Sequence, residues 1–241
     1  MSDAIRTCLY AADINLTEYD FKAVYESMPL QRVTKCDRLR FEDDKKRCVL
    51  GWALLVYSLC DFSGEPLCKE VLEYVRNHFA QSEKGKPYID GIRTYFNISH
   101  SGDKVICAFS DVEVGCDVER KTCDCLKIAQ RFFAENEYKY LYNISDMGAL
   151  DKEFLRIWTR KEAFVKAKGF GIAYPFGNIS FVDKEGKISD MSVDEENQMY
   201  YFQSIDEDDG YLYSICKKSP DPVMNLRRVE KIVLPYCPRN L

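Results

Sequence analysis

Residues 94–110 read TYFNISHSGDKVICAFS, two strand-like runs joined by Gly102-Asp103. A glycine followed by aspartate between two such runs is a β-hairpin signal. The chain continues into DVEVGCDVE at residues 111–119, where apolar and acidic side chains alternate with the period of two that is typical of a strand. The middle of the chain is therefore predicted to be a hairpin followed by a further strand.

Outward from this centre, strands, helices and a meander are predicted twice. The first half is read as a strand over 5–14, helices over 15–25, 29–38, 43–59 and 69–79, and then the hairpin. The second half is read as a strand over 113–119, helices over 125–133, 136–142 and 152–168, and strands over 178–182, 199–203, 211–216 and 229–234. This pattern predicts an α+β fold made of two similar halves, residues 1–112 and 113–241.

The composition is that of an ordinary globular protein. The chain has 241 residues, of which 46% are hydrophobic and 30% charged, and its net charge is −5. This acidic balance argues against broad binding to nucleic acid or to an anionic membrane, although local basic clusters can still hold a small polyanion. No run approaches the roughly 18 apolar residues of a membrane span, and the first residues lack a signal-peptide pattern. A cytoplasmic protein is therefore predicted, with its eleven cysteines as reduced core thiols.

The acidic strand is the first candidate site. Its apolar side chains occupy the even positions, so that Asp111, Glu113, Asp117 and Glu119 share the opposite face. Carboxylates at i and i+2 of a strand lie roughly 7 Å apart at their backbones, which suits one hard divalent cation such as magnesium. The alternative for this segment alone is a half-buried strand with a solvated acidic face.

A second candidate lies in the predicted helix over 152–168. Leu155, Trp158, Glu162 and Val165 follow a 3, 4, 3 spacing, which places a carboxylate in a row of otherwise apolar side chains. Burying a carboxylate is costly unless it meets a cation, a metal or hydrogen-bond donors. The alternative is a surface ion pair between Glu162 and Lys166, one helical turn apart.

The strand end at residues 97–101, Asn-Ile-Ser-His-Ser, offers short donors for phosphate or ribose oxygens. Ser99 and His100 are neighbours in sequence, so their side chains diverge on a strand, and no nucleophile-elbow motif surrounds them. A serine hydrolase is therefore disfavoured, and an ordinary polar strand end remains the alternative.

Taken together, three motifs resemble the surfactin-type 4′-phosphopantetheinyl transferases. That family carries F-N-x-S-H-S, G-x-D-x-E and W-x-x-K-E-A-x-x-K-x-x-G in this order, and the chain has FNISHS at 96–101, GCDVE at 115–119 and WTRKEAFVKAKG at 158–169. The resemblance implies two α/β subdomains related by a pseudo-twofold, with the active site in the cleft between them. It also implies transfer of 4′-phosphopantetheine from coenzyme A to a serine of an apo acyl or peptidyl carrier protein, with release of 3′,5′-ADP.

The resemblance further assigns residues to roles. Mg²⁺, with Mn²⁺ as an alternative, is expected on Asp117, Glu119 and Glu162, and catalysis on Glu162 as the base and Lys166 as a stabiliser of phosphate charge. The expected coenzyme ligands are basic, hydroxyl and imidazole side chains: Arg32, Lys35, Arg47, Lys86, Ser99, His100 and Lys161. Cys48 stands where many members of the family have threonine.

The same resemblance predicts a monomer whose carrier docks near residues 120–145, where aromatic side chains are dense. Neither nucleic acid nor a membrane is expected as a partner. Two alternatives use the same residues: a metal-dependent phosphohydrolase, and a non-catalytic module that binds coenzyme A or a carrier. The phosphohydrolase does not explain FNISHS beside GKP, and a non-catalytic module would normally have lost one of the three carboxylates, all of which are present.

Overall fold

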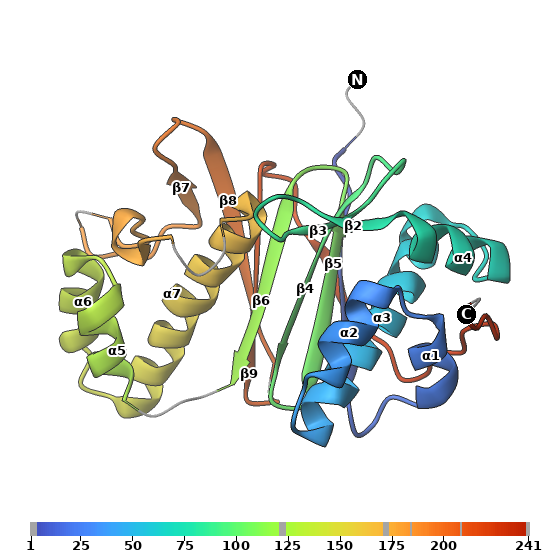
Figure 1. The fold of residues 1–241 in the computed structure, drawn as a ribbon. Helices are drawn as coiled ribbons and strands as arrows, with labels where there is room; N and C mark the ends of the chain where they lie inside the picture. The colour runs from blue at the N-terminus through green and yellow to red at the C-terminus, as the bar shows by residue number, and fades with distance from the viewer. Residues whose placement is uncertain (1–3, 121–123, 171–173, 184, 208, 240–241) are drawn as a thin grey trace.

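Two four-stranded sheets form the centre of the molecule (Figure 1). The computed structural model describes residues 4–120, 124–170, 174–183, 185–207 and 209–239. The first sheet has the order β10-β1-β5-β4, and its strands are β1 (Thr7–Asp13), β4 (Tyr95–Ser101), β5 (Lys104–Ser110) and β10 (Met224–Arg228). The second has the order β6-β9-β8-β7, and its strands are β6 (Val114–Arg120), β7 (Met191–Val193), β8 (Met199–Asp206) and β9 (Tyr211–Lys217).

Neighbouring strands in these sheets are antiparallel except at one edge, where β10 runs parallel to β1. The inner faces of β1, β5, β6 and β9 meet in a shared core that includes Leu9, Ile106, Cys116 and Ile215. A separate ribbon pairs β2 (Phe79–Gln81) with β3 (Pro87–Ile89). The last strand of the chain therefore belongs to the same sheet as the first strand.

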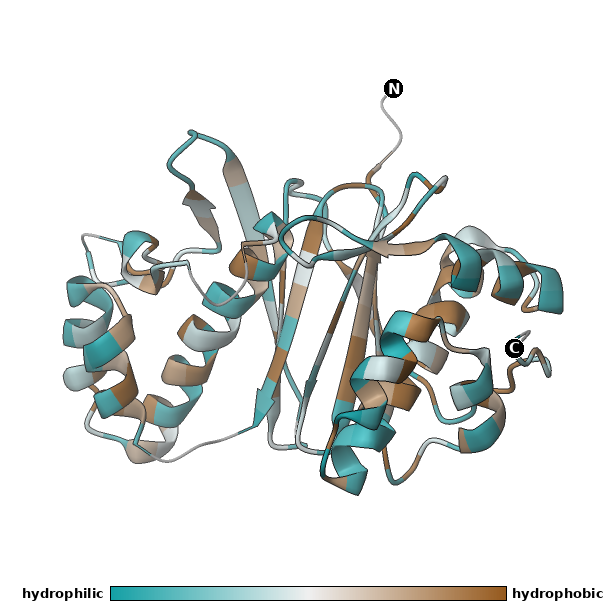
Figure 2. Ribbon diagram, in the orientation of Figure 1, coloured by the Kyte–Doolittle hydropathy of each residue, from teal (hydrophilic) through white to brown (hydrophobic). Residues whose placement is uncertain are grey.

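Helices cover the outer sides of this pair of sheets (Figure 1). On the side of the first sheet lie α1 (Phe21–Ser27), α2 (Leu30–Asp37), α3 (Glu42–Ser63) and α4 (Lys69–His78). On the other side lie α5 (Cys125–Phe132), α6 (Glu135–Tyr142), α7 (Met147–Lys168) and the 3₁₀ turn η2 (Phe176–Asn178). These outer helices alternate hydrophilic and hydrophobic turns (Figure 2), as helices do when one face packs on a sheet.

The predicted hairpin is confirmed. Strands β4 and β5 pair along their whole length, with Ser101 opposite Lys104 at the closed end. Gly102 in the turn has φ +53°, a left-handed conformation that glycine adopts without steric cost. The long helices α3 and α7 were also expected, and both extend beyond their predicted bounds.

The helix expected over 15–25 was placed too early. The carboxylate of Asp13 accepts hydrogen bonds from the backbone N–H of Asn15 and Leu16, which fixes a turn in that segment. The helix begins only at Phe21, after Asp20 caps it by accepting from the N–H of Ala23. Local side-chain bonds to the backbone outcompete the helical ladder here.

Two predicted strands in the C-terminal third are wrong. Residues 178–182 begin in a 3₁₀ turn, and Val182 forms only an isolated bridge with Ile188. Residues 229–234 likewise contribute one bridge, from Lys231 to Glu18, because the strand that pairs with β1 ends earlier, at Arg228. The predicted combination of helices and β-sheets is nevertheless present.

The expectation of cysteines as core residues is met, since nine of the ten described cysteines are buried. None of the helices within the described ranges combines the length and the apolar composition needed to cross a bilayer.

Candidate active site

The hairpin strand β4 and the acidic strand β6 lie beside each other and are joined by their side chains. The amide oxygen of Asn97 accepts from the N–H of Cys116 at 2.9 Å. Two residues further on, the hydroxyl of Ser99 donates to Oδ1 of Asp117 at 2.8 Å, and the hydroxyl of Ser101 donates to Oε2 of Glu119 at 2.6 Å. Because side chains on one face of a strand recur every second residue, one strand supplies an amide and two hydroxyls to the other.

The four acidic residues of the predicted face do not all take part. Asp111 pairs with Arg6 at 3.3 Å, and Glu113 pairs with Lys218 at 2.7 Å. Only Asp117 and Glu119 meet the hydroxyls of β4. The alternation of the sequence was thus interpreted correctly, but it could not tell which half of the acidic face belongs to the site.

Gly115 allows helix α7 to lie directly against β6. A Cβ atom at this position would come within 2.0 Å of the carbonyl oxygen of Ala163 and 2.4 Å of the backbone nitrogen of Ala167. No side chain fits in that space, so glycine is required for the contact between helix and strand. This close approach brings Glu162 and Lys166 of α7 towards Asp117.

Lys166 binds Asp117, the more deeply buried of the two acidic residues that β6 contributes to the site. Its ammonium donates to Oδ1 of Asp117 at 2.6 Å and to the hydroxyl of Ser99 at 2.8 Å. The other carboxylate oxygen of Asp117 is buried and has no hydrogen-bond partner among the described atoms. Burial raises the pKa of Asp117, and the ammonium of Lys166 opposes that rise.

Glu162 lies close enough to both acidic residues to be affected by their charges. Burial raises its pKa to about 7, repulsion from Asp117 adds to the rise, and repulsion from Glu119 contributes less, while Lys166 opposes it. The carboxylate that the sequence placed in an apolar row therefore faces the acidic strand. A group that titrates near neutral pH can accept a proton under ordinary conditions.

The donor set fits a hard divalent cation. Three carboxylates repel one another here, and one buried oxygen of Asp117 has no partner, both of which a divalent cation would relieve. Within the described residues, however, no three His, Cys, Asp or Glu side chains converge into a ready-made metal cluster. The metal ligands Asp117, Glu119 and Glu162 thus stay a prediction.

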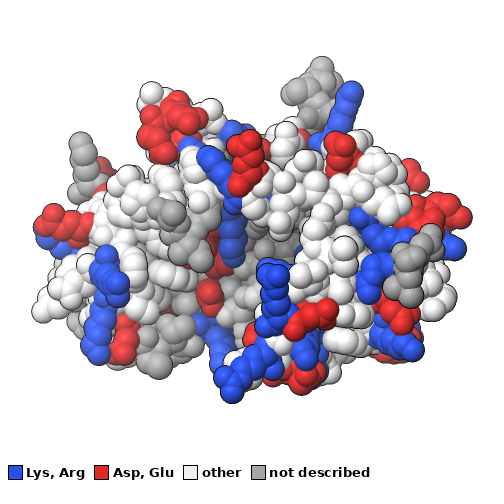
Figure 3. Space-filling model, viewed as in Figure 1, with Lys and Arg blue, Asp and Glu red and all other residues white. Residues whose placement is uncertain are grey.

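Basic side chains surround His100 on the other side of the hairpin. His100 is an exposed residue near the end of β4. Partial loss of solvent around its imidazole lowers its pKa, and the positive charges of Arg47, Lys166 and Lys35 lower it further. In Figure 3, basic side chains rim the hollow between the two sides of the molecule and acidic ones lie within it. This arrangement suits an anion that spans from His100 to Lys166.

Lys86 lies near the start of β6 and the end of α7, with its ammonium already bonded. It donates to the carbonyl oxygens of Ala167 at 2.6 Å and Val114 at 3.3 Å, and so ties the segment after β2 to the end of α7. Lys86 and Pro87 line a cavity of about 640 Å³ together with Tyr95 and Gly169. The GKP segment is therefore next to a cavity, but its charge is used within the protein.

Two of the predicted coenzyme ligands, Arg32 and Lys161, have side chains that bond within the protein. Arg32 donates to the carbonyl of Cys48 at 2.9 Å and lies over the ring of Phe79, while its buried Nε has no partner among the described atoms, so its role as a coenzyme ligand stays a prediction. Lys161 has a side chain that is 0% exposed and forms an ion pair with Glu137 at 2.8 Å. Lys161 is one residue from Glu162, but successive helical residues face different directions.

The motifs include Asn97, Ser101 and Gly115, but no contact was predicted from the sequence for any of the three. The contacts of the first two could have been found from the period of two that places 97, 99 and 101 on one face of the strand. The motif marks Gly115, but the reason for a glycine there comes from the backbone of α7, which is distant in sequence.

Without divalent cations, we expect the folded protein to lose stability as the pH rises through about 7. The pKa of Glu162 is about 7 in the folded protein against an ordinary value of 4.5. The folded state therefore holds this proton more tightly than the unfolded state. The protonated Glu162 contributes up to about 3 kcal/mol to the free energy of unfolding at low pH, and this contribution is lost as the pH rises. Glu162→Gln removes the titration. Urea unfolding at about pH 5 and about pH 8 should show a smaller pH dependence in the variant, and equal dependence in both proteins would contradict the assignment.

Comparison with known proteins finds relatives among the phosphopantetheinyl transferases. The model of the 4′-phosphopantetheinyl transferase superfamily matches residues 113–216. The 4′-phosphopantetheinyl transferase Sfp of Bacillus subtilis (strain 168) is 33% identical over 194 residues, which covers 78% of this chain and 80% of that protein. The 4′-phosphopantetheinyl transferase psf-1 of Bacillus pumilus is 30% identical over 185 residues, 76% of each chain. The L-aminoadipate-semialdehyde dehydrogenase-phosphopantetheinyl transferase of Xenopus laevis is 27% identical over 187 residues, 68% of this chain and 60% of that protein.

Proposed function

The chain belongs to the surfactin-type 4′-phosphopantetheinyl transferase family, and on that premise we propose that the site between β4, β6 and α7 performs the transfer. The enzyme moves 4′-phosphopantetheine from coenzyme A to carrier proteins. The observation that carries the assignment of the site is the contact of Lys166 and Ser99 with the same oxygen of Asp117. It brings all three sequence motifs of the family to one place.

The proposed reaction is a phosphoryl transfer. The serine hydroxyl of the apo carrier attacks the β-phosphorus of coenzyme A, a new P–O bond forms, and the bond to 3′,5′-ADP breaks as that group leaves with the electron pair. Such a step depends on positioning and on charge neutralisation more than on covalent help from the protein. Glu162 accepts the proton of the serine, directly or through a water molecule, from its position on α7 facing Asp117.

Asp117, Glu119 and Glu162 would hold Mg²⁺, with Mn²⁺ as an alternative, and the ion would supply neutralisation of pyrophosphate charge. Lys166 adds a positive charge from the helix beside Asp117. We propose that Lys35, Arg47 and His100 bind the 3′-phosphate, because the charges of both basic side chains act on the imidazole near the end of β4. Lys86 and the cavity beside it would lie along the nucleotide.

The halves 1–112 and 113–241 are proposed to be related by a pseudo-twofold with the coenzyme site in the cleft between them. In support, each side has one sheet and one long helix packed against it, α3 on the first and α7 on the second. The tail is an exception, because β10 lies beside β1 in the first sheet.

An apo acyl or peptidyl carrier is proposed to dock on the described part of segment 120–145, whose residues 121–123 lie outside the described ranges, with the enzyme acting as a monomer. Phe132 is 41% exposed and Tyr142 66% exposed, whereas Phe133 and Leu141 are buried in the core. Only the exposed rings of this aromatic segment are available to a partner. Carrier proteins are acidic, and Arg131 beside Phe132 supplies a complementary charge.

The test is intact-mass analysis of an apo carrier incubated with the enzyme and coenzyme A, with and without Mg²⁺. We expect the carrier to gain one phosphopantetheinyl group only when the metal and coenzyme are both present. Release of phosphopantetheine or phosphate in a reaction without carrier would instead indicate a phosphohydrolase. Binding of coenzyme without any mass gain on several carriers would indicate a non-catalytic module.

A further inference from the structure

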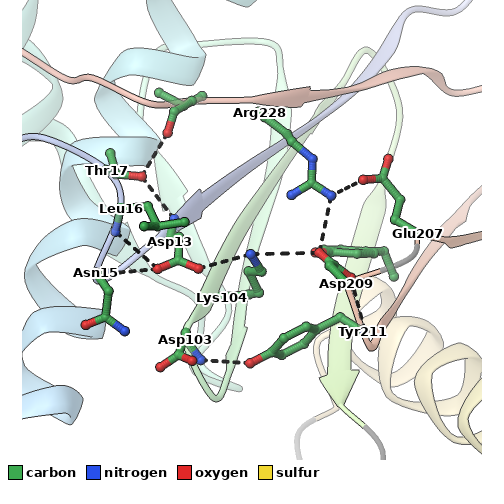
Figure 4. A network of polar contacts seen from close by, with 12 residues as sticks. Asp13, Asn15, Leu16, Thr17, Asp103, Lys104, Glu207, Asp209, Tyr211 and Arg228 are labelled. Atoms are coloured by element: carbon green, nitrogen blue, oxygen red, sulfur yellow. Dashed lines mark hydrogen bonds and ion pairs between the residues drawn. The ribbon is translucent and has the colours of Figure 1, made fainter.

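The turn that follows the FNISHS motif is held from two sides. On one side, Nη1 of Arg47 in α3 donates to the carbonyl of Gly102 at 2.6 Å. On the other, the backbone N–H of Asp103 donates to the hydroxyl oxygen of Tyr211 in β9 at 3.0 Å. Figure 4 shows the Tyr211 hydroxyl reaching Asp103. One bond comes from a helix on the first sheet and the other from the second sheet, so the turn connects the two sides of the molecule.

Gly102 fits under the Tyr211 hydroxyl because it has no side chain. A Cβ at this position would lie 2.3 Å from the hydroxyl oxygen of Tyr211, well inside van der Waals contact. The tyrosine hydroxyl is the end of a rigid ring and cannot swing aside as a lysine would. The hydroxyl therefore sets how closely the turn approaches β9.

The ring of Tyr211 is itself fixed in place. Tyr211 is 8% exposed in the core between the two sheets. In the sheet, it lies opposite Arg120, the last residue of β6. The ammonium of Lys104 lies over the ring, 5.6 Å from its centre. That ammonium is held in turn by Asp13 at 3.0 Å and Asp209 at 3.8 Å, as Figure 4 shows.

The position of the turn matters because the site residues of β4 directly precede it. Ser99 and Ser101 bond to the acidic strand, and His100 faces the basic side chains. We propose that Tyr211 is a positioning residue: its hydroxyl sets the depth at which the His100 end of β4 and the Arg47 side chain meet the 3′-phosphate of the coenzyme. The inference rests on the proposed function and names a residue that lies outside the three motifs.

The test compares Tyr211→Phe with Tyr213→Phe in steady-state transfer. Tyr213 is a control on the same strand and in the same core: its hydroxyl donates to Asp209, which also pairs with Lys104, whereas the hydroxyl of Tyr211 accepts from the turn. For Tyr211→Phe we expect the KM for coenzyme A to rise about fivefold, the effect of one lost hydrogen bond, and the KM for dephospho-coenzyme A to change by less than about twofold. Tyr213→Phe should leave the ratio of the two KM values unchanged even if it lowers the melting temperature equally.

Equal changes in both KM values, or no change, would overturn the positioning role. Wild-type transfer activity in the same assay tests the proposed function separately, so the two can fail independently. A change of the KM ratio in Tyr213→Phe as large as that in Tyr211→Phe would also count against the role, because it would show a general effect of the strand.

A second pair of variants tests the close approach. Gly102→Ala forces a Cβ against the Tyr211 hydroxyl, so we expect a larger rise in the KM for coenzyme A than Tyr211→Phe gives. The double variant Gly102→Ala/Tyr211→Phe removes the oxygen that the Cβ meets, and it should recover part of the loss, although the left-handed backbone at residue 102 still disfavours alanine. Effects of the two substitutions that simply add would overturn the inference, because independent sites are additive and neighbours are not.

Discussion

Replacement of Asp117 by asparagine is expected to lower kcat/KM for phosphopantetheine transfer by about a thousandfold, as does the loss of a group that stabilises charge in other transferring sites. Asp117 joins the three parts of the site: it accepts from Ser99 and Lys166, and its charge raises the pKa of Glu162. The amide keeps the shape but removes the charge, so Lys166 loses its counter-ion. The measurement is the initial rate of mass gain on an apo carrier at saturating Mg²⁺.

Asp194→Asn is the matched control for this substitution. Asp194 forms an ion pair of the same length, 2.6 Å, with Lys168 on the same helix, and that pair is also largely shielded from solvent. We expect Asp194→Asn to cost stability without lowering the rate more than about twofold, because it lies outside the charges that act on Glu162. Comparable losses of rate in the two variants would show that Asp117 acts only through the stability of the fold.

Lys161→Met is expected to destabilise the protein by about 3–5 kcal/mol, because it leaves a buried carboxylate without its partner. The ammonium of Lys161 bonds to the carboxylate of Glu137 and to the carbonyls of Phe176 and Ile179, and both side chains of the ion pair are 0% exposed. Glu137 also accepts from the N–H of Phe181, so the pair fastens the segment after η2 to α6 and α7. Urea unfolding followed by circular dichroism measures the loss.

The double variant Lys161→Met/Glu137→Gln should regain at least half of that loss, since no charge is then left buried. As a surface control, Lys152→Met breaks an ion pair with Asp206 whose members are 49% and 45% exposed, and it should cost less than about 1 kcal/mol. At temperatures where Lys161→Met is folded, the KM for coenzyme A should be unchanged. A large rise in that KM with little loss of stability would restore Lys161 as a ligand of the coenzyme.

The elements that were predicted correctly are those whose sequence pattern lies within the segment itself. The hairpin over 94–110 and the long helix that ends at Gly169 carry their own turn and periodicity signals, and both are present. Residues 178–182 read as a strand, but Lys161 takes the carbonyls of Phe176 and Ile179 and holds the segment in an irregular path. Whether a segment pairs with a neighbouring strand depends on residues far away in the chain.

The prediction of the site shows the same division. Asp117, Glu119, Glu162, Lys166, Ser99 and His100 were named from motifs, and the structure brings their side chains together. The metal and coenzyme roles of these residues remain proposals with the tests given above. Lys161 stands in the same motif as Glu162, yet the helix turns its side chain into the core.

The sequence by itself determined the chemical groups, their alternation along two strands and a helix, and the family to which they belong, because these are properties of short segments. The tertiary structure alone decided which groups face each other. Contact between β4 and β6, the approach of α7 over Gly115 and the bond from Tyr211 to the turn each join residues distant in sequence. Residues 94–110 thus form a hairpin because of their own turn. The depth of that hairpin in the site is set by side chains from α3 and β9, which only the packing of the molecule brings within reach.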